Sequence, residues 1–373
     1  VCFCHRQQQP KTSLETFGRK YLVLLLKYRC CWLGSPLFDV SDKEHGRIAV
    51  SNICDAQGRR PLLLSPAFKD YIWGGNRLKR DWGKRTDMTP LAESWELSCH
   101  EAGPSVIAGG AYAGRTLGDY LAEHPEDAGT KAQNAGAFPL LIKLIDAAGP
   151  LSVQVHPDDA YAREFEHSLG KSEMWLVLDA SEGAGIYYGF KRETPLAEMR
   201  AAIENNTLTE LLSWVPAKTG DCFFIPAGTV HAIGKGALIA EIQQNSNVTY
   251  RVYDYDRRGA DGKPRELHVA KALDVAVPEP PKYDTQPMGQ KENIGGGSRQ
   301  LLARCPLFTV YHYAVSDTVQ LAAGAESFQH ILVTDGYGTI DGRLLQKGDS
   351  FLVPAGYGNF AVSGQLEMLV TSI

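Results

Sequence analysis

A turn pattern that occurs twice restricts the folds open to this chain more than any other feature of its sequence. Residues 220–231 follow the spacing Gly-x5-Pro-x-Gly-x2-His, and residues 348–359 repeat it with asparagine in the last place. Upstream of each copy, the segment 173–177 aligns with the segment 329–333. A duplicated strand–turn–strand unit predicts a mainly β chain with two related β-barrels of the jelly-roll type. The 37 glycines and 20 prolines supply the many turns of such a fold.

The two copies differ at two positions that bear on metal binding. Gln329 and Asn359 stand, in the second copy, where the first copy has Glu173 and His231. We therefore expect the second unit to have lost any metal, and we assign the chemistry to the first unit.

Changes in composition divide the chain into four parts. Residues 1–58 mix basic, aromatic and Cys-Cys elements without a sustained period, and we expect an extension that is disordered or lies outside the folded unit. Residues 59–276 form the predicted catalytic, metal-binding barrel, with a few helices inserted in it or packed on it. Residues 277–298, rich in proline and glycine, are expected to be a linker or crossover. Residues 299–373 form the second, degenerate barrel.

The charge balance limits the partners of the chain. A net charge of -5 over 373 residues argues against nucleic acid or an anionic membrane as the main partner. No apolar run has the length needed to cross a bilayer, and the cysteines beyond residue 58 are scattered, as in proteins of a reducing compartment. We expect a cytoplasmic protein that acts on a small molecule. Monomer and homodimer both stay open.

The first unit offers donors for one divalent metal. In residues 151–156, apolar side chains alternate with Ser, Gln and His, which predicts a strand with one polar face. Gln154 and His156 then point the same way, about 7 Å apart along the backbone. With Glu173 and His231 they form a mixed nitrogen and oxygen set, suited to Zn²⁺ or a similar cation. So few charged ligands leave the metal net positive, which favours stabilising a carbonyl or enediolate oxygen.

Several motifs carry a resemblance to a known family. The turn at 220–231 resembles the second motif of the cupin superfamily, although Lys235 stands where that motif usually has asparagine. Four other segments, in their order, resemble type I mannose-6-phosphate isomerases of the short bacterial form. They are Phe-Pro-Leu-Leu-Ile-Lys at 138–143, Leu-Ser-Val-Gln-Val-His-Pro-Asp at 151–158, Lys-Ser-Glu-Met-Trp at 171–175 and Asn-Val-Thr-Tyr-Arg at 247–251. The resemblance covers residues 61–373.

The resemblance implies a role for each residue of the predicted site. The zinc ligands of the family correspond to Gln154, His156, Glu173 and His231. The active-site arginine corresponds to Arg251, and a pocket carboxylate to Glu241. Ser152 and Lys143 correspond to the residues that hold the substrate phosphate. Lys171, two residues before Glu173, faces the same pocket if its segment is extended, and we expect it to help in proton transfer.

The implied reaction interconverts D-mannose 6-phosphate and D-fructose 6-phosphate by metal-assisted proton transfer through a cis-enediolate. Glu241 and a metal-bound water are both open as the proton carrier. Two other classes stay open: another metal-dependent cupin enzyme, such as a dioxygenase, and a sugar-phosphate-binding protein without activity. The residues also allow plainer interpretations, in which Arg251 pairs with Asp254 or Asp256 and Glu241 only balances Arg251.

Overall fold

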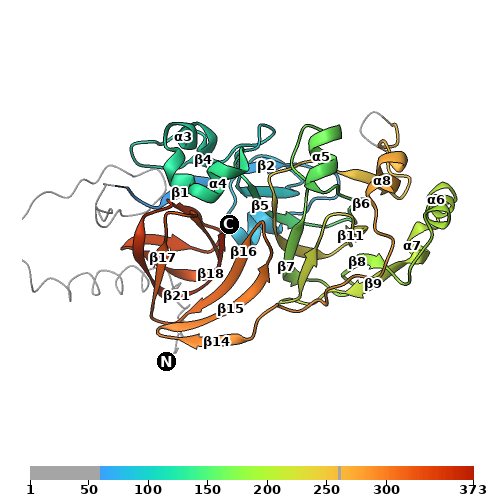
Figure 1. The fold of residues 1–373 in the computed structure, drawn as a ribbon. Helices are drawn as coiled ribbons and strands as arrows, with labels where there is room; N and C mark the ends of the chain where they lie inside the picture. Colours follow the sequence, from blue (N-terminus) through green and yellow to red (C-terminus); the bar gives the residue numbers. More distant parts are fainter. Residues whose placement is uncertain (1–58, 259–261) are drawn as a thin grey trace, which may run out of the picture. The chain divides into compact units, whose positions relative to one another are not determined.

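The computed structural model describes residues 59–258 and 262–373, and strands dominate its fold (Figure 1). The extension expected over residues 1–58 lies outside the described residues. No helix in the described part of the chain is long and apolar enough to cross a membrane. Three antiparallel sheets contain the strands, which confirms the prediction of a mainly β protein.

Two of the sheets pack face to face and form the region predicted to be catalytic. The six-stranded sheet has the order β10 (Cys222–Ile225), β7 (Glu173–Ala180), β12 (Ala237–Gln244), β5 (Leu140–Asp146), β3 (Glu93–Leu97) and β2 (Ala67–Lys69). The five-stranded sheet has the order β13 (Tyr250–Tyr253), β6 (Val153–Val155), β11 (His231–Ile233), β8 (Gly185–Phe190) and β9 (Leu212–Pro216). Their facing sides share one apolar core, in which Trp175 and Phe223 of the first sheet meet Ile186 and Tyr188 of the second.

The third sheet contains the strands of the C-terminal region. Its order is β14 (Lys291–Ile294), β15 (Gly297–Arg304), β16 (Thr309–Val315), β21 (Gly358–Ser372), β18 (Gln329–Ile340), β20 (Ser350–Val353), β1 (Leu62–Ser65) and β4 (Val106–Ile107), with β17 (Thr318–Ala323) beside β21 and β19 (Arg343–Gln346) beside β18. These strands enclose a separate apolar core that includes Val333, Phe351 and Phe360.

The sequence repeat is present as a repeated pairing of strands. Strand β7 pairs with β10 in the same register in which β18 pairs with β20. In both copies the first glycine of the turn donates its N–H over 2.9 Å to the preceding strand, Gly220 to the carbonyl of Val177 and Gly348 to that of Val333. In the second copy the interior is filled by the apolar core, and Gln329 donates to a backbone carbonyl 2.7 Å away.

The boundaries of the predicted parts differ from those of the sheets. Strand β1 lies in the part predicted to be the catalytic barrel, residues 59–276, yet it pairs with β20 of the C-terminal sheet. Strand β14 and the start of β15 occupy residues 291–298, within the stretch expected to be a linker or crossover. These residues form an edge hairpin through pairing with each other, and the glycine-rich composition concealed that pairing. The division into domains stays a prediction.

Alternation along the strands gives the six-stranded sheet two different faces. Ile142 and Met174 point into the core that this sheet shares with the C-terminal sheet. Lys143, Glu173 and Glu241 lie at alternate positions and so point the opposite way, toward the five-stranded sheet. The site is therefore built on the inner side of the two-sheet unit.

All described helices fall within residues 59–276, the part in which helices were predicted. They are α2 (Arg77–Trp82), α3 (Leu117–Glu123), the 3-10 turn η1 (Pro125–Ala128), α4 (Thr130–Ala135), α5 (Asp159–Phe165), α6 (Leu196–Glu204), α7 (Leu208–Leu211) and α8 (Val269–Val275). Thr116 caps α3 and Asp158 caps α5, because each side chain accepts the backbone N–H three residues on. The buried side of α8 packs behind β6 and β13, the strands that carry part of the site.

Candidate metal centre and catalytic pocket

Three of the predicted metal ligands converge inside the two-sheet unit. His156 directly follows β6, Glu173 begins β7 and His231 begins β11. Their ligand atoms all lie within 4.8 Å of one another. Nε2 of His231 is 3.2 Å from Oε1 of Glu173, and Nε2 of His156 is 3.8 Å from Oε2 of the same carboxylate. All three side chains are buried, so the cluster is shielded from bulk water.

The register of the five-stranded sheet explains how residues from three distant segments meet. His231 on β11 and Arg251 on β13 are the direct partners of Gln154, one on each side of β6. Cross-strand partners project from the same face, so these side chains form a row. The amide Nε2 of Gln154 lies 3.5 Å from Nε2 of both His156 and His231. Rotating the amide by a half-turn exchanges its nitrogen and oxygen, which places the oxygen of Gln154 beside the Nε2 atoms of both histidines.

Backbone carbonyls set the orientation of both histidine rings. Nδ1 of His156 donates to the carbonyl of Val248 at 2.9 Å, and Nδ1 of His231 donates to that of Thr229 at 2.8 Å. Burial, with the nearby charge of Lys171, lowers the pKa of His231 to about 3 and the pKa of His156 well below its usual range. A neutral ring that donates from Nδ1 has a lone pair on Nε2. Both lone pairs face the cluster, as in metal-binding histidines.

Glu173 supplies the negative charge of the cluster. Burial raises the pKa of its carboxyl group to about 7, although Lys171 opposes the shift. Nζ of Lys171 donates to Oε2 at 2.5 Å and lies 2.9 Å from Nε2 of His156. Oε1 is buried and accepts no hydrogen bond from the described residues. An unsatisfied carboxylate oxygen beside two imidazole lone pairs is costly unless positive charge lies between them, so this donor set fits a metal cation.

A buried ion pair lies on the facing sheet. Lys143 on β5 and Glu241 on β12 are cross-strand partners, and Nζ is 2.9 Å from Oε2. Oε1 of Glu241 accepts the indole N–H of Trp175 at 3.0 Å. Burial opposes both charges, but mutual attraction outweighs it: Glu241 and Glu93 raise the pKa of Lys143, and Lys143 lowers the pKa of Glu241 to about 2. Glu241 therefore balances Lys143 and not Arg251.

Arg251 has a half-buried guanidinium without a carboxylate partner among the residues that the structure describes. Nε donates to Oγ of Ser152 at 3.3 Å, and Nη1 donates to the carbonyl of Glu266 at 3.0 Å. Asp254, a partner that the sequence allowed, instead binds two other arginines. Burial and these neighbouring arginines lower the pKa of Arg251. An anionic ligand would relieve this excess of positive charge.

The predicted residues thus fall into two groups of contacts. One group surrounds a single point and consists of Gln154, His156, Glu173, His231 and Lys171. In the other group, Ser152 contacts Arg251 while Lys143 contacts Glu241, so the two predicted phosphate residues have different partners. Sequence reasoning missed His268, which contacts Arg251. No motif or spacing pointed to His268, because the contact forms only when the chain folds back on β13.

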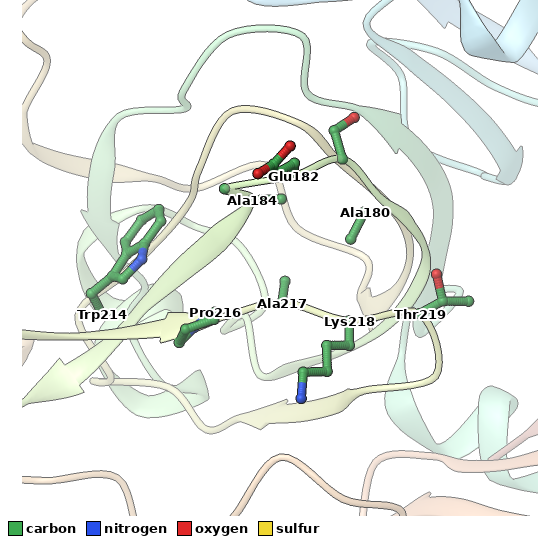
Figure 2. A pocket seen from close by; sticks show the side chains of 10 residues that line it. Ala180, Glu182, Ala184, Trp214, Pro216, Ala217, Lys218 and Thr219 are labelled. Atoms are coloured by element: carbon green, nitrogen blue, oxygen red, sulfur yellow. The ribbon is translucent and has the colours of Figure 1, made fainter.

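A separate hollow of about 460 Å³ lies at the opposite end of β7 from the metal cluster (Figure 2). Residues 180–184 and 214–219 line it. Ala180, Ala184 and Ala217 lie in the middle of the lining, Trp214 lies to one side of them, and Glu182 and Lys218 lie on opposite sides. The hollow contains none of the predicted site residues, so we assign the chemistry to the buried cluster.

Comparison with known proteins identifies the family. Residues 62–181 match the family described as phosphomannose isomerase type I, catalytic domain, and residues 299–373 match the cupin domain of mannose-6-phosphate isomerase. A mannose-6-phosphate isomerase from Streptococcus mutans is 39% identical over 315 residues, which cover 83% of this chain and 98% of the relative. The chain belongs to the type I phosphomannose isomerase family.

Other comparisons agree with membership of the phosphomannose isomerase family. Mannose-6-phosphate isomerase ManA from Bacillus subtilis is 40% identical over 319 residues, which cover 84% of this chain and 99% of the relative. A crystal structure of mannose 6-phosphate isomerase from Bacillus subtilis is 37% identical, has a TM-score of 0.77, and is matched over 84% of this chain and 100% of its own. A phosphomannose isomerase variant from Salmonella typhimurium, 16% identical with a TM-score of 0.67, shares the fold.

Proposed function

We infer that this chain is a mannose-6-phosphate isomerase, which interconverts D-mannose 6-phosphate and D-fructose 6-phosphate. Relatives of that name are 39% and 40% identical to it and are covered almost completely. The observation that carries the inference is the buried cluster of His156, Glu173 and His231, in which His231 lies in one cross-strand row with Gln154 and Arg251. The cluster offers metal donors, and the guanidinium offers a permanent positive charge for an anionic sugar. Because a charged phosphosugar does not cross membranes freely, this substrate supports the cytoplasmic location expected from the sequence.

The cluster would hold one divalent metal, and zinc suits its mixed donors. The ligands would be Gln154, His156, Glu173 and His231. When bound, such an ion supplies positive charge that stabilises negative charge on the reacting oxygens of the sugar. The carbonyl contacts of the two histidines direct both Nε2 atoms toward the cluster, and Lys171 keeps the Glu173 carboxylate in place.

The protein must also stabilise charge and grip the phosphate. The reaction moves a proton between C1 and C2 while the carbonyl shifts the other way, through a cis-enediolate. Arg251 does not readily give up a proton, so its role is to stabilise the developing negative charge and to orient the reacting end. Ser152 and Lys143 are the proposed phosphate residues. Ser152 can share an anionic oxygen with Arg251, since Nε of Arg251 already contacts its hydroxyl.

Glu241 is the proposed proton carrier, with Lys171 as a helper. Its pKa of about 2 makes it a weak base while Lys143 remains its ion-pair partner. If the substrate phosphate draws Lys143 away, Glu241 loses the attraction that lowers its pKa, and its basicity rises. Phosphate binding and proton transfer would then be linked through one lysine.

A coupled assay of fructose 6-phosphate formation, with and without a chelator and paired with metal analysis, tests the proposed function. We expect one zinc per chain, loss of activity with the chelator, and recovery on adding zinc. A Glu173→Gln protein should lose metal and activity together while circular dichroism shows an intact fold. Full activity in a metal-free protein would contradict the proposal. Oxygen consumption would indicate a dioxygenase, and binding without turnover would indicate a sensor.

A further inference from the structure

The chain folds back onto Arg251 shortly before α8 begins. The backbone N–H of Arg251 donates to Nδ1 of His268 at 3.2 Å, and the N–H of His268 donates to the carbonyl of Arg251 at 2.8 Å. Two residues earlier, the carbonyl of Glu266 accepts Nη1 of Arg251 at 3.0 Å. The returning segment therefore contacts both the backbone and the guanidinium of Arg251.

Contacts on each side hold this returning segment in place. Arg265, next to Glu266, donates from Nε to Oδ2 of Asp254 at 2.7 Å, and Asp254 is buried. On the other side, His268 occupies the N-cap position of α8, whose buried face packs behind β13. The carbonyl that receives the guanidinium of Arg251 thus lies between two anchored residues.

The imidazole of His268 acts here as an acceptor and must be neutral on Nδ1. Burial lowers its pKa, and the charged groups near it are Glu266, Arg251, Lys271 and Glu166. Within the described ranges, the hydrogen bond of its side chain joins it to the backbone of Arg251 and not to the metal cluster. Its chemistry is therefore that of a support for Arg251 rather than of a metal ligand.

We propose that His268 is a positioning residue that holds Arg251 at the angle required for the isomerase reaction. The inference rests on the proposed function, because it concerns the arginine assigned to charge stabilisation. Without the acceptor on His268, the N–H of Arg251 loses its partner, and only the backbone hydrogen bond from His268 to the Arg251 carbonyl still joins this position to β13. The guanidinium can then shift relative to the substrate. A displacement of about 1 Å in a positioned group can cost up to about 100-fold in rate.

Two substitutions at this position separate positioning from packing. His268→Ala removes the acceptor, whereas His268→Asn keeps an acceptor oxygen and a good N-cap side chain. We expect His268→Ala to lower kcat about tenfold, with KM and metal content nearly unchanged, and His268→Asn to retain most of the activity. Equal impairment in both variants would overturn the proposal, provided that thermal unfolding shows both to be folded.

A double-mutant cycle with Arg251→Ala shows whether His268 acts through the arginine. We expect His268→Ala to have less than about a twofold effect once Arg251 is absent, because the two residues then act as one unit. If His268→Ala lowered kcat by the same factor in the wild-type protein and in Arg251→Ala, His268 would act independently of the arginine, and the proposal would be rejected.

A measurement independent of activity separates this inference from the proposed function. The Nε–H signal of Arg251, assigned by its absence in Arg251→Ala, reports the order of the guanidinium in an NMR spectrum. We expect a sharp signal in the wild-type protein and in His268→Asn, and a broadened or shifted one in His268→Ala. An unchanged signal in His268→Ala rejects the positioning role. A wild-type protein without isomerase activity rejects the proposed function and leaves this test valid.

Discussion

The chemistry of single residues in this site depends on which charges have partners. Lys143 pairs with Glu241 and Lys171 pairs with Glu173, yet Oε1 of Glu173 accepts no hydrogen bond and Arg251 has no carboxylate partner among the described residues. The open carboxylate oxygen of Glu173 and the guanidinium of Arg251 have opposite charges. They suit two different ligands, a metal cation at Glu173 and an anionic substrate at Arg251.

Replacing Arg251 with alanine should separate catalysis from metal binding. We expect Arg251→Ala to keep its metal, because Arg251 is not one of the ligands, and to lose about 100- to 1000-fold in kcat, as when one donor to a developing oxyanion is removed. Metal analysis and steady-state kinetics measure the two effects. Arg163→Ala, at an exposed position on α5, is the matched control and should retain normal turnover. Unchanged turnover in Arg251→Ala would place Arg251 outside the site.

The buried pair of Lys143 and Glu241 should affect stability in a non-additive way. Removing one partner leaves an uncompensated buried charge, so Lys143→Met or Glu241→Gln alone should lower the free energy of unfolding by about 3–5 kcal/mol. The double variant should be more stable than either single variant, because both charges are gone. Urea unfolding of the wild-type protein, the two single variants and the double variant gives the free energies for a double-mutant cycle. Strictly additive losses would show that the pair is not coupled.

At the scale of elements, the turn between β10 and β11 positions the predicted metal ligand His231. Gly228 has φ +88°, and its N–H donates to the carbonyl of His156 at 2.8 Å, so the turn that precedes His231 also contacts a second ligand. A Cβ at Gly228 would lie 2.8 Å from a side-chain atom of Val277. Both the backbone angle and the close approach require glycine here.

A substitution in this turn should weaken metal binding without touching a ligand. We expect Gly228→Ala to raise the metal dissociation constant about tenfold, since the clash of the new Cβ with Val277 displaces a turn that precedes His231 and contacts His156. Gly220→Ala is the matched control, because Gly220 also has positive φ but has open space around its Cβ position. Competition with a coloured chelator measures both affinities. Equal affinities for the two variants would argue against a role of this turn in metal binding.

At the scale of the whole molecule, a buried polar network joins the two-sheet unit to the C-terminal sheet. Nζ of Lys84 lies 2.6 Å from the carboxylate of Glu96 on β3, and the hydroxyl of Ser350 on β20 donates to the Glu96 carbonyl at 2.8 Å. Nε2 of His330 on β18 lies 2.8 Å from the same hydroxyl. A buried network of this kind ties the stability of one sheet to that of the other.

His330 should make the stability of the protein depend on pH. Burial lowers its pKa to about 3, whereas an unfolded chain has a histidine pKa of about 6.5. Between these values the unfolded state binds a proton that the folded state does not, so stability falls as the pH decreases. From pH 7 to pH 5 the loss from this residue is about 2 kcal/mol. In a His330→Gln protein, the decrease in the free energy of unfolding from pH 7 to pH 5, measured by urea unfolding, should be smaller by that amount. A decrease equal to that of the wild-type protein would show that His330 is not the cause of this pH dependence.

The sequence by itself determined the features that depend on local order along the chain. Alternation with period 2 predicted the strands, and the repeated turn spacing predicted two related units, with which the matching register of β7 with β10 and of β18 with β20 is consistent. The same local segments carried the family resemblance, and His156, Glu173 and His231 do converge.

Only the tertiary structure decided which distant residues become neighbours. It paired Gln154 with both His231 and Arg251, matched Lys143 with Glu241, and brought His268 back to the arginine. It also placed β1 in the C-terminal sheet. The physical reason is that cross-strand partners depend on the register between segments tens of residues apart. A one-residue slip would turn every side chain to the other face, and packing of the whole core selects the register.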